Sequence, residues 1–225
     1  MAERQIVAMG GGGSDEDEAA RLITFLLGLT GKERPRVGFV PTASAENPDL
    51  LVSLYATFSG HADCSHIPFF PWPPENLRDR VLTQDVLFVG GGNTANMLAV
   101  WRAHGFDRIV REAWEQGVVL YGWSAGMIAW FEQGVTDSFG PQLEGMDCLG
   151  FLPGSACPHY DGEGLRRPRY RELVDDGFRP GWAADDGVAL HFVGTELAEA
   201  VTIRPGARAY RVEPGSETPV EARLL

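Results

Sequence analysis

A serine flanked by glycines stands in the middle of the chain, in the pentad Gly122-Trp123-Ser124-Ala125-Gly126. The apolar run 118–121 before it is typical of a buried strand. The apolar residues after it predict the start of a helix: Met127, Ile128, Trp130 and Phe131. Glycines relieve crowding in a tight strand-to-helix turn and leave the hydroxyl exposed above the sheet. The pattern predicts that Ser124 is a nucleophile, with an ordinary glycine-flanked turn as the alternative.

A serine hydroxyl needs a base that removes its proton and an acid that orients this base. His159 is the best candidate base, because it stands in the polar, turn-forming segment 157–163, where a loop can aim a side chain at the carboxyl edge of the sheet. His191 lies in an apolar run and is expected to be a hydrogen-bonded core residue. The other histidines are expected to be solvated or satisfied locally: His61, His66 and His104.

Two aspartates are candidates for the acid, Asp137 and Asp186, and each lies next to a predicted turn or strand end. Their positions in the sequence do not choose between them. The amide of Ala125 directly follows the nucleophile, which makes it the first expected donor to an oxyanion. The second donor is expected from Gly91 or Gly92, because a backbone without a side chain can approach a reacting carbonyl closely. A tight turn at a strand end is the alternative there.

Composition sets limits on the function. The 225 residues are 44% hydrophobic and 22% charged, as in a soluble globular protein, and they predict a single domain spanning 1–225. The net charge is 19 − 31 = −12, without a basic cluster, so we expect no nucleic acid partner. No stretch approaches the roughly 18 apolar residues that span a bilayer, so we expect no membrane association and a cytoplasmic location.

Three cysteines, an odd number without paired short spacings, predict neither a disulfide framework nor a zinc site. Cys157 and His159 are two positions apart, but no further ligands follow at suitable spacing. We therefore expect no metal and no cofactor.

The first two thirds of the chain alternate between apolar strand and helix patterns, which predicts a mostly parallel sheet with helices on both faces. The expected strands are 5–9, 37–40, 64–67, 85–89 and 118–121, and the expected helices follow Ser14 and cover 49–58, 76–81, 95–104 and 106–116. The segment 136–158 is rich in turn residues, and a helix is expected at 167–174. The rest predicts a C-terminal group of short strands at 188–193, 200–203 and 209–212.

The glycine run 10–13 lies between a predicted strand and a helix that Ser14 can cap, an arrangement found in phosphate sites. Three carboxylates would occupy the first helical turn: Asp15, Glu16 and Asp17. They would repel a phosphate and already complement the helix dipole. We therefore do not expect a nucleotide there.

Four segments, in the right order over most of the chain, resemble the peptidase E family of serine peptidases related to alpha-aspartyl dipeptidase and, more distantly, cyanophycinase. They are 89–94 (VGGGNT), 122–127 (GWSAGM), Pro158-His159-Tyr160 with Glu163 and Arg167, and 184–190 (ADDGVAL). The resemblance implies a three-layer fold like that of class I glutamine amidotransferases, with Ser124 as nucleophile and His159 as base. It also implies substrate-binding roles for the matched residues Asn93, Thr94, Glu163 and Arg167.

The two branches of this family imply different acids: alpha-aspartyl dipeptidase points to a position at or near Asp137, whereas cyanophycinase points to Asp186. We favour Asp186, because it follows a predicted strand and could reach the far side of His159. Family members act on peptides with an N-terminal aspartate or on aspartate-linked polymers. No arginine is assigned by motif as the clamp for a substrate carboxylate. The candidates are Arg166, Arg167 and Arg169, but a solvated helix face is the favoured explanation of all three.

The sequence thus predicts a serine exopeptidase or dipeptidase that acts on small peptides. A homodimer is a candidate assembly, and peptides with an N-terminal aspartate are the candidate preferred substrates. Two alternatives stay open. One is an esterase of related geometry, and the other is a catalytically silent module that binds a ligand with its glycine loops.

Overall fold

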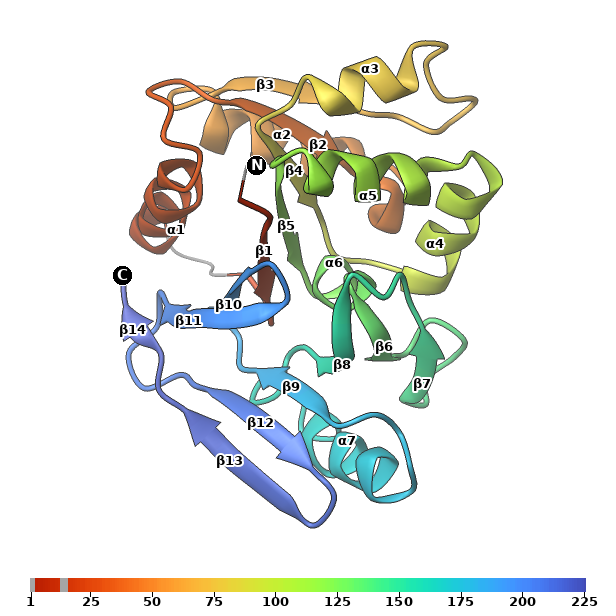
Figure 1. The fold of residues 1–225 in the computed structure, drawn as a ribbon, viewed down its shortest axis with the longest axis vertical. Coiled ribbons are helices and arrows are strands. Elements are labelled where there is room, and N and C mark those ends of the chain that lie inside the picture. The colour runs from red at the N-terminus through yellow and green to blue at the C-terminus, as the bar shows by residue number, and fades with distance from the viewer. Residues whose placement is uncertain (1–2, 13–15) are drawn as a thin grey trace.

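The computed structural model describes residues 3–12 and 16–225 and has a mixed α/β fold built on two sheets (Figure 1). The main sheet has eight strands in the order β14-β11-β10-β1-β5-β4-β2-β3. The five strands from β1 to β3 in this order are parallel, and β10 and β11 continue the sheet in antiparallel pairing. The bounds are β1 Gln5–Met9, β2 Arg36–Val40, β3 Asp63–His66, β4 Val86–Val89, β5 Val119–Trp123, β10 Val188–Val193, β11 Glu196–Thr202 and β14 Arg223–Leu224.

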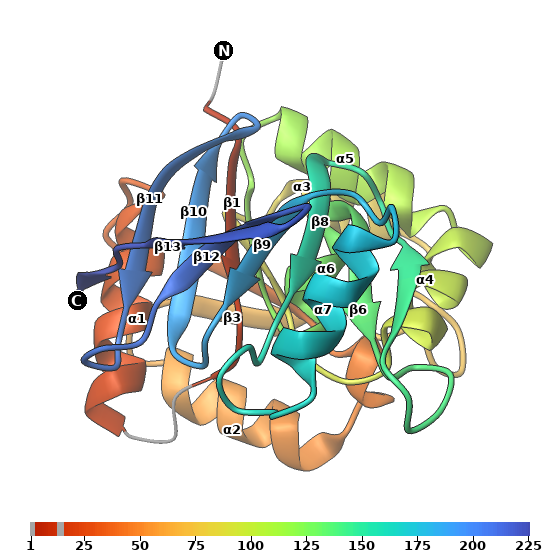
Figure 2. The same cartoon turned by 90° about the horizontal axis from the view of Figure 1, so that it is seen from below.

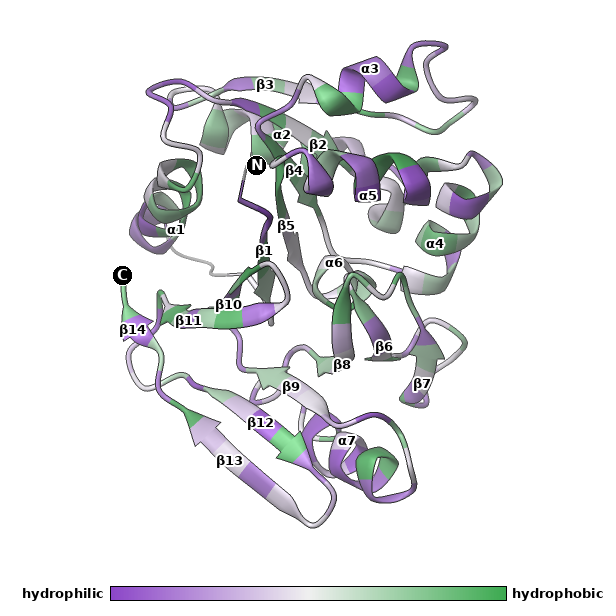
Figure 3. Ribbon diagram, viewed as in Figure 1, coloured by the Kyte–Doolittle hydropathy of each residue, from purple (hydrophilic) through white to green (hydrophobic). Residues whose placement is uncertain are grey.

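Helices cover both faces of the main sheet, as the alternating pattern predicts. Successive side chains of a strand point to opposite faces. In β1, Val7 and Met9 join the apolar cluster under α1 and α2, whereas Ile6 and Ala8 join the cluster under α3, α4 and α5. Strand β4 and the start of β5 are accordingly hydrophobic (Figure 3). The helices are α1 Glu16–Gly28, α2 Pro48–Phe58, α3 Leu77–Leu82, α4 Thr94–Ala103 and α5 Phe106–Glu115, with a 3-10 turn at Thr42–Ser44.

The second sheet has six strands in the order β13-β12-β9-β8-β6-β7 and carries helix α7 (Figure 2). Strands β6, β8 and β9 are parallel, and the remaining pairs are antiparallel. The bounds are β6 Phe131–Thr136, β7 Glu144–Asp147, β8 Leu152–Cys157, α7 Arg166–Asp175, β9 Gly181–Ala184, β12 Ala209–Glu213 and β13 Ser216–Val220.

Two expectations about this region hold only in part. The helix after Ser124 is only the short α6 (Ala125–Ala129), and Phe131 already begins β6. The segment 136–158 contains β7 and β8 rather than turns alone. The sequence of β8, LPGSAC, has few residues that favour strands, so its conformation comes from pairing with β6 and β9 and not from propensity.

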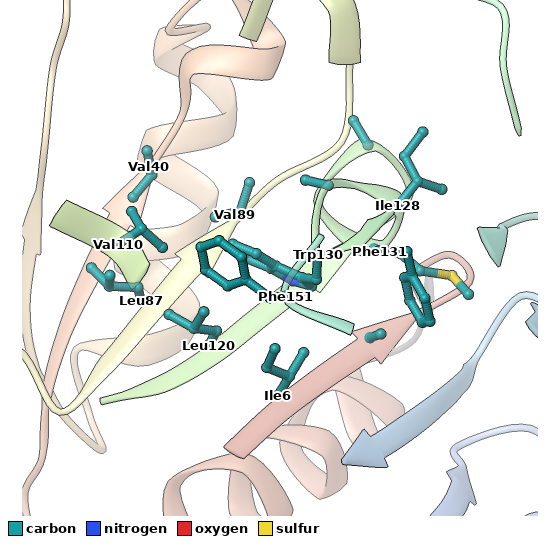
Figure 4. Close-up of a cluster of buried hydrophobic side chains, with 14 of the residues drawn as sticks. Ile6, Val40, Leu87, Val89, Val110, Leu120, Ile128, Trp130, Phe131 and Phe151 are labelled. Carbon is teal, nitrogen blue, oxygen red and sulfur yellow. The ribbon is translucent and has the colours of Figure 1, made fainter. Parts of the chain in front are cut away.

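Aromatic residues that follow α6 pack against the face of the main sheet that α3, α4 and α5 cover. Trp130 and Phe151 lie together near Val89 and Leu120, with ring centroids 5.8 Å apart (Figure 4). This packing fixes the short α6 between the two sheets. Among the described residues, no helix combines the length and the apolar character that crossing a bilayer requires.

Candidate active site

Ser124 sits at the turn between β5 and α6, and its backbone has the rare dihedral angles φ 52° and ψ −111°. The two glycines of the pentad make this turn possible. A Cβ atom at Gly122 would lie 2.3 Å from the carbonyl oxygen of Gly126, and one at Gly126 would lie 2.3 Å from that of Val89. A strained, partly exposed serine between two such close approaches has the geometry of a nucleophile elbow.

A continuous line of hydrogen bonds joins Ser124 to a histidine and an aspartate. His159 Nε2 lies 2.9 Å from Ser124 Oγ, and His159 Nδ1 lies 2.6 Å from Asp186 Oδ1. The side chains of His159 and Asp186 are 23% and 27% exposed, so the line is partly shielded but open to a ligand. An ionised Asp186 can only accept, which makes Nδ1 the donor and leaves the lone pair of Nε2 facing the serine hydroxyl.

Three strand ends explain why these side chains meet. Ser124 follows β5, whereas His159 and Asp186 follow β8 and β9, which are parallel neighbours in the second sheet. The carboxyl ends of parallel strands lie at one edge, where ligands bind in open α/β sheets. An isolated bridge between Gly11 and Asp186 joins the end of β1 to the loop after β9, which brings the two edges together.

The N-terminal glycine run serves this junction. A Cβ atom at Gly11 would lie 1.9 Å from Asp186 Oδ1 and 2.7 Å from His159 Nδ1. Gly11 therefore leaves the space that the histidine–aspartate pair occupies, a role that the sequence does not reveal. The helix cap expected at Ser14 and the carboxylate of Asp15 lie outside the described residues.

Of the expected oxyanion donors, Gly91 and Ala125 lie beside the serine, whereas Gly92 lies against another loop. A Cβ atom at Gly91 would be 3.2 Å from Ser124 Cβ, and Gly92 packs against the backbone of Ala43. Ala125 begins α6. Within residues 3–12 and 16–225, the amides of Gly91 and Gly92 donate no hydrogen bond to another backbone group.

A model of peptidase family S51 matches residues 6–200, most of the chain. The chain belongs to peptidase family S51. It is 49% identical over 213 residues to the uncharacterized peptidase YgaJ of Bacillus subtilis (strain 168), which covers 93% of this chain and 92% of YgaJ. It is also 31% identical over 136 residues to peptidase E of Shewanella denitrificans, covering 56% of each chain. This S51 chain is therefore a peptidase and a relative of peptidase E.

Two solved structures share the fold of this S51 peptidase. A peptidase from an acI-B1 actinobacterium superimposes with a TM-score of 0.73 at 15% identity, covering 98% of this chain and 95% of the other. A candidate peptidase E protein from Listeria monocytogenes EGD-e gives a TM-score of 0.65 at 18% identity, covering 90% of this chain and all of the other. At such identities the likeness concerns the fold alone.

Asp137, the other candidate acid, does not contact His159 in this S51 peptidase. Its side chain is 59% exposed, and its ion-pair partner is Arg166, at 4.0 Å. Of the two carboxylates that the sequence offers, the structure brings only Asp186 to the histidine.

Asn93 and Thr94, two of the expected substrate-binding residues, hold the end of the glycine loop in place. Asn93 caps α4 by accepting from the amide of Asn96, and its side-chain NH₂ donates to the carbonyl of Ser138. Thr94 is only 1% exposed, and its amide donates to the Ser138 hydroxyl. The Asn93 side chain and the Thr94 amide therefore hold the end of the glycine loop against the segment after β6.

The candidate clamp arginines all have partners within the protein, and only Arg166 is buried; Arg167 and Arg169 are partly exposed, as a solvated helix face predicts. Arg166 is 4% exposed and donates to Glu163 and to the carbonyl of Val135. Arg167 pairs with Glu217 and lies over the ring of Tyr210, 4.8 Å from its centroid. Arg169 donates to Glu172 and to the carbonyl of Leu143.

His191 and His66 agree with the expectations from sequence. His191 is 6% exposed and bonds to Gln5 at 2.9 Å, and His66 bonds to the Tyr55 hydroxyl at 3.0 Å. Burial raises the pKa of the Cys157 thiol to about 12, so it stays protonated and is a poor metal ligand near neutral pH. In the described part of the chain, no three side chains of the metal-binding types form a cluster.

Two residues that the sequence analysis did not single out also belong to this site, Asp161 and Arg204. Asp161 accepts from the backbone amide of Asp186, and Arg204 donates to the backbone carbonyl of the same residue. Asp161 is two positions from His159, but Arg204 is 18 positions beyond Asp186 along the chain. No local pattern in the sequence marks such a pair, because only the tertiary fold brings it together.

Proposed function

We propose that this peptidase uses a serine mechanism and removes the first residue of small peptides, as a dipeptidase or exopeptidase. The observation that carries the proposal is the hydrogen-bonded line from Ser124 Oγ through the His159 ring to Asp186, with distances of 2.9 and 2.6 Å. Both distances lie in the range that proton transfer in acyl chemistry requires.

In the proposed reaction, Ser124 Oγ attacks the carbonyl carbon of the first peptide bond while His159 Nε2 takes the hydroxyl proton. The imidazolium then gives this proton to the departing amine as the C–N bond breaks, which leaves an acyl ester on Ser124. A water molecule, deprotonated by the same nitrogen, hydrolyses the ester and restores the serine. Asp186 holds the ring in the tautomer that both steps need and stabilises its positive charge.

The amides of Ala125 and Gly91 are the proposed donors to the oxyanion that forms on the carbonyl oxygen, with Gly92 as the alternative to Gly91. Their support comes from position, since Ala125 follows the nucleophile and Gly91 lies against its Cβ atom. Each such donor typically contributes about 3 kcal/mol to transition-state stability.

An N-terminal aspartate is the first side chain to test as the substrate preference, because the resemblance to the dipeptidase branch favours it. The arginines of α7 do not add to this argument, since each is already paired with a protein carboxylate. The chain order Ser124, His159, Asp186 differs from the serine, acid, histidine order of α/β-hydrolase esterases and disfavours that alternative.

The test compares three single variants on a panel of dipeptides that begin with aspartate, glutamate, asparagine or a neutral residue. Ser124→Ala should reduce hydrolysis to background, and Asp186→Asn should lower kcat by about 10⁴-fold because it favours the wrong tautomer. Asp137→Asn is the matched control and should retain most of the activity. Full activity of Ser124→Ala would overturn the mechanism.

Two further readouts separate the alternatives. Turnover of p-nitrophenyl esters without turnover of any peptide would identify an esterase. Failure of a fluorophosphonate to label Ser124, together with tight binding of a ligand, would identify a catalytically silent module.

A further inference from the structure

Both backbone polar groups of Asp186, its amide and its carbonyl, are hydrogen-bonded to side chains from other segments. Its amide donates to Asp161 Oδ1 at 2.8 Å, and its carbonyl accepts from Arg204 Nη1 at 2.9 Å. The second nitrogen, Arg204 Nη2, lies 3.2 Å from Asp161 Oδ2. These three contacts close a ring around the backbone of Asp186, and we call Asp161 and Arg204 the backbone clamp.

Each member of the clamp is fixed to a different part of the fold. Asp161 lies two positions after His159, in a segment whose Tyr160 amide donates to the carbonyl of Ala184 at 3.1 Å. Arg204 follows β11, where its own amide donates to the Thr202 hydroxyl at 3.1 Å. The clamp therefore ties the loop of the base, the loop of the acid and the end of β11 to one another.

This arrangement controls a distance that the proposed reaction needs. Asp186 Oδ1 and His159 Nδ1 are 2.6 Å apart, and a shift of the acid loop by 1 Å would break their hydrogen bond. The side chain of Asp186 cannot hold this loop itself, because its Oδ1 faces the imidazole. The backbone contacts with Asp161 and Arg204 restrain the loop at Asp186 itself. The neighbouring amides of Asp185 and Gly187 add to this restraint by donating to the carbonyls of Arg208 and Gly11.

We propose that Asp161 and Arg204 are positioning residues for the Asp186–His159 pair. This inference rests on the proposed serine mechanism. Neither residue touches the reacting atoms in this arrangement; they act through the backbone of Asp186. The side chains of Arg204 and Asp161 are 41% and 34% exposed, and ion pairs at this exposure contribute little to stability. Their loss should therefore affect the reaction more than the fold.

The main test uses Arg204→Met, which keeps the aliphatic stem that packs beside Gly187 and removes all donors. The probe is a fluorophosphonate, and the measured quantity is its second-order rate of labelling Ser124, which needs no identified substrate. We expect a decrease on the order of 10- to 100-fold, because a misplacement near 1 Å has this effect. Asp161→Ala should give a decrease of the same order.

Arg208→Met is the matched control, since it removes the same charge from the same loop. Its backbone contacts Asp185, but its side chain takes no part in the clamp. The fluorophosphonate should label Ser124 of this variant at the wild-type rate. Arg204→Lys keeps the charge but cannot donate to Asp161 and to the Asp186 carbonyl through a planar fork. Its rate should lie between those of the wild type and Arg204→Met.

A second readout reports the positioning directly. The proton between His159 Nδ1 and Asp186 should give a downfield NMR resonance in the wild type, and it should broaden or move upfield in Arg204→Met but not in Arg208→Met. Wild-type labelling and an unchanged resonance in Arg204→Met would overturn the inference. If the wild type itself is not labelled, the serine mechanism fails. In that case, loss of the resonance in Arg204→Met but not in Arg208→Met would still support the positioning role.

Discussion

The two residues that exchange a proton in the proposed reaction both have strained backbones. Ser124 and His159 each have a φ of 52°, in the left-handed region that residues other than glycine rarely adopt. Each such residue costs on the order of 1–3 kcal/mol and persists only where its surroundings hold it. At His159 these surroundings include the amide of Glu163, which donates to the His159 carbonyl. Of the four residues other than glycine with a positive φ in the described part of the chain, two thus lie where side chains must be aimed at each other; the other two are Ala45 and Glu46.

Gly11 allows a direct test of how closely the site is packed. In Gly11→Ala the new methyl group would lie 1.9 Å from Asp186 Oδ1, so either the acid or the end of β1 must move. We expect the rate of peptide hydrolysis, or of fluorophosphonate labelling, to fall by about a hundredfold or more. Circular dichroism should show that the fold is retained.

The neighbouring Gly12→Ala is the control for this prediction. Its Cβ atom would lie 3.3 Å from the Trp123 ring, which a small shift can accommodate. Similar rates for the two variants would contradict the view that Gly11 leaves room for the histidine–aspartate pair.

Sequence alone indicated Ser124, His159 and Asp186, because each stands in a glycine- or turn-rich segment next to a strand. It left Asp137 open, since distance along the chain says nothing about which carboxylate reaches the far nitrogen of His159. It did not find Gly11 or Arg204, whose roles depend on the bridge between the end of β1 and the loop after β9. Residues that act through tertiary contacts of this kind have no local sequence pattern.

At the scale of elements, the parallel strands could be predicted because both of their faces are buried, which makes them short apolar runs, and the helices because each buries one apolar face. The strands of the second sheet were harder to find. β8 is made of small residues, and β7 has no buried residue in the sequence EGMD, so neither shows an alternating pattern. Both are strands because β6 pairs with each of them. Yet it is β8 and β9 that deliver His159 and Asp186.

The hairpin formed by β12 and β13 is anchored to the segment that follows His159. Glu217 in β13 accepts from the Tyr160 hydroxyl and from Arg167, and its side chain is only 9% exposed. Burial alone would raise the pKa of Glu217, but the hydrogen bonds from Tyr160 and Arg167 outweigh it and lower the pKa. The ionised carboxylate is thus favoured by the folded state.

Glu217→Gln should lower the free energy of unfolding at neutral pH by about 2 kcal/mol, since it weakens hydrogen bonds to a charged group. The folded pKa lies below the unfolded one, so the wild-type advantage is present above the ordinary value of 4.5 and is lost as pH falls through the lowered value. Urea denaturation across this range measures the difference. Glu213→Gln, a 53% exposed position on the same hairpin, should have little effect, and equal effects of the two variants would contradict this anchor.

At the scale of the whole molecule, the proposed site depends on two sheets that must keep their relative position. Gly11 and Asp186 form the bridge between them, and β10, which directly follows the Asp186 loop, pairs with β1 in the main sheet. Conditions that destabilise β1 and β10 should therefore unfold the main sheet and disassemble the site together. His191 provides such a condition, because it lies in β10 opposite Val7 and bonds to Gln5.

Burial lowers the pKa of His191 from its ordinary value of 6.5, so the folded protein binds a proton there less readily than the unfolded chain. Glu199 and Glu3 oppose this effect only in part. The free energy of unfolding should therefore fall as pH decreases below 6.5, by at most about 1.4 kcal/mol per pH unit from this group. In His191→Gln, whose amide can still donate to Gln5, this part of the slope should disappear. Urea denaturation between pH 7 and 5 measures this dependence of the free energy of unfolding on pH, with a variant of the exposed His61, His61→Gln, as control. An unchanged dependence in His191→Gln would show that protonation of His191 in β10 does not destabilise the fold at acidic pH.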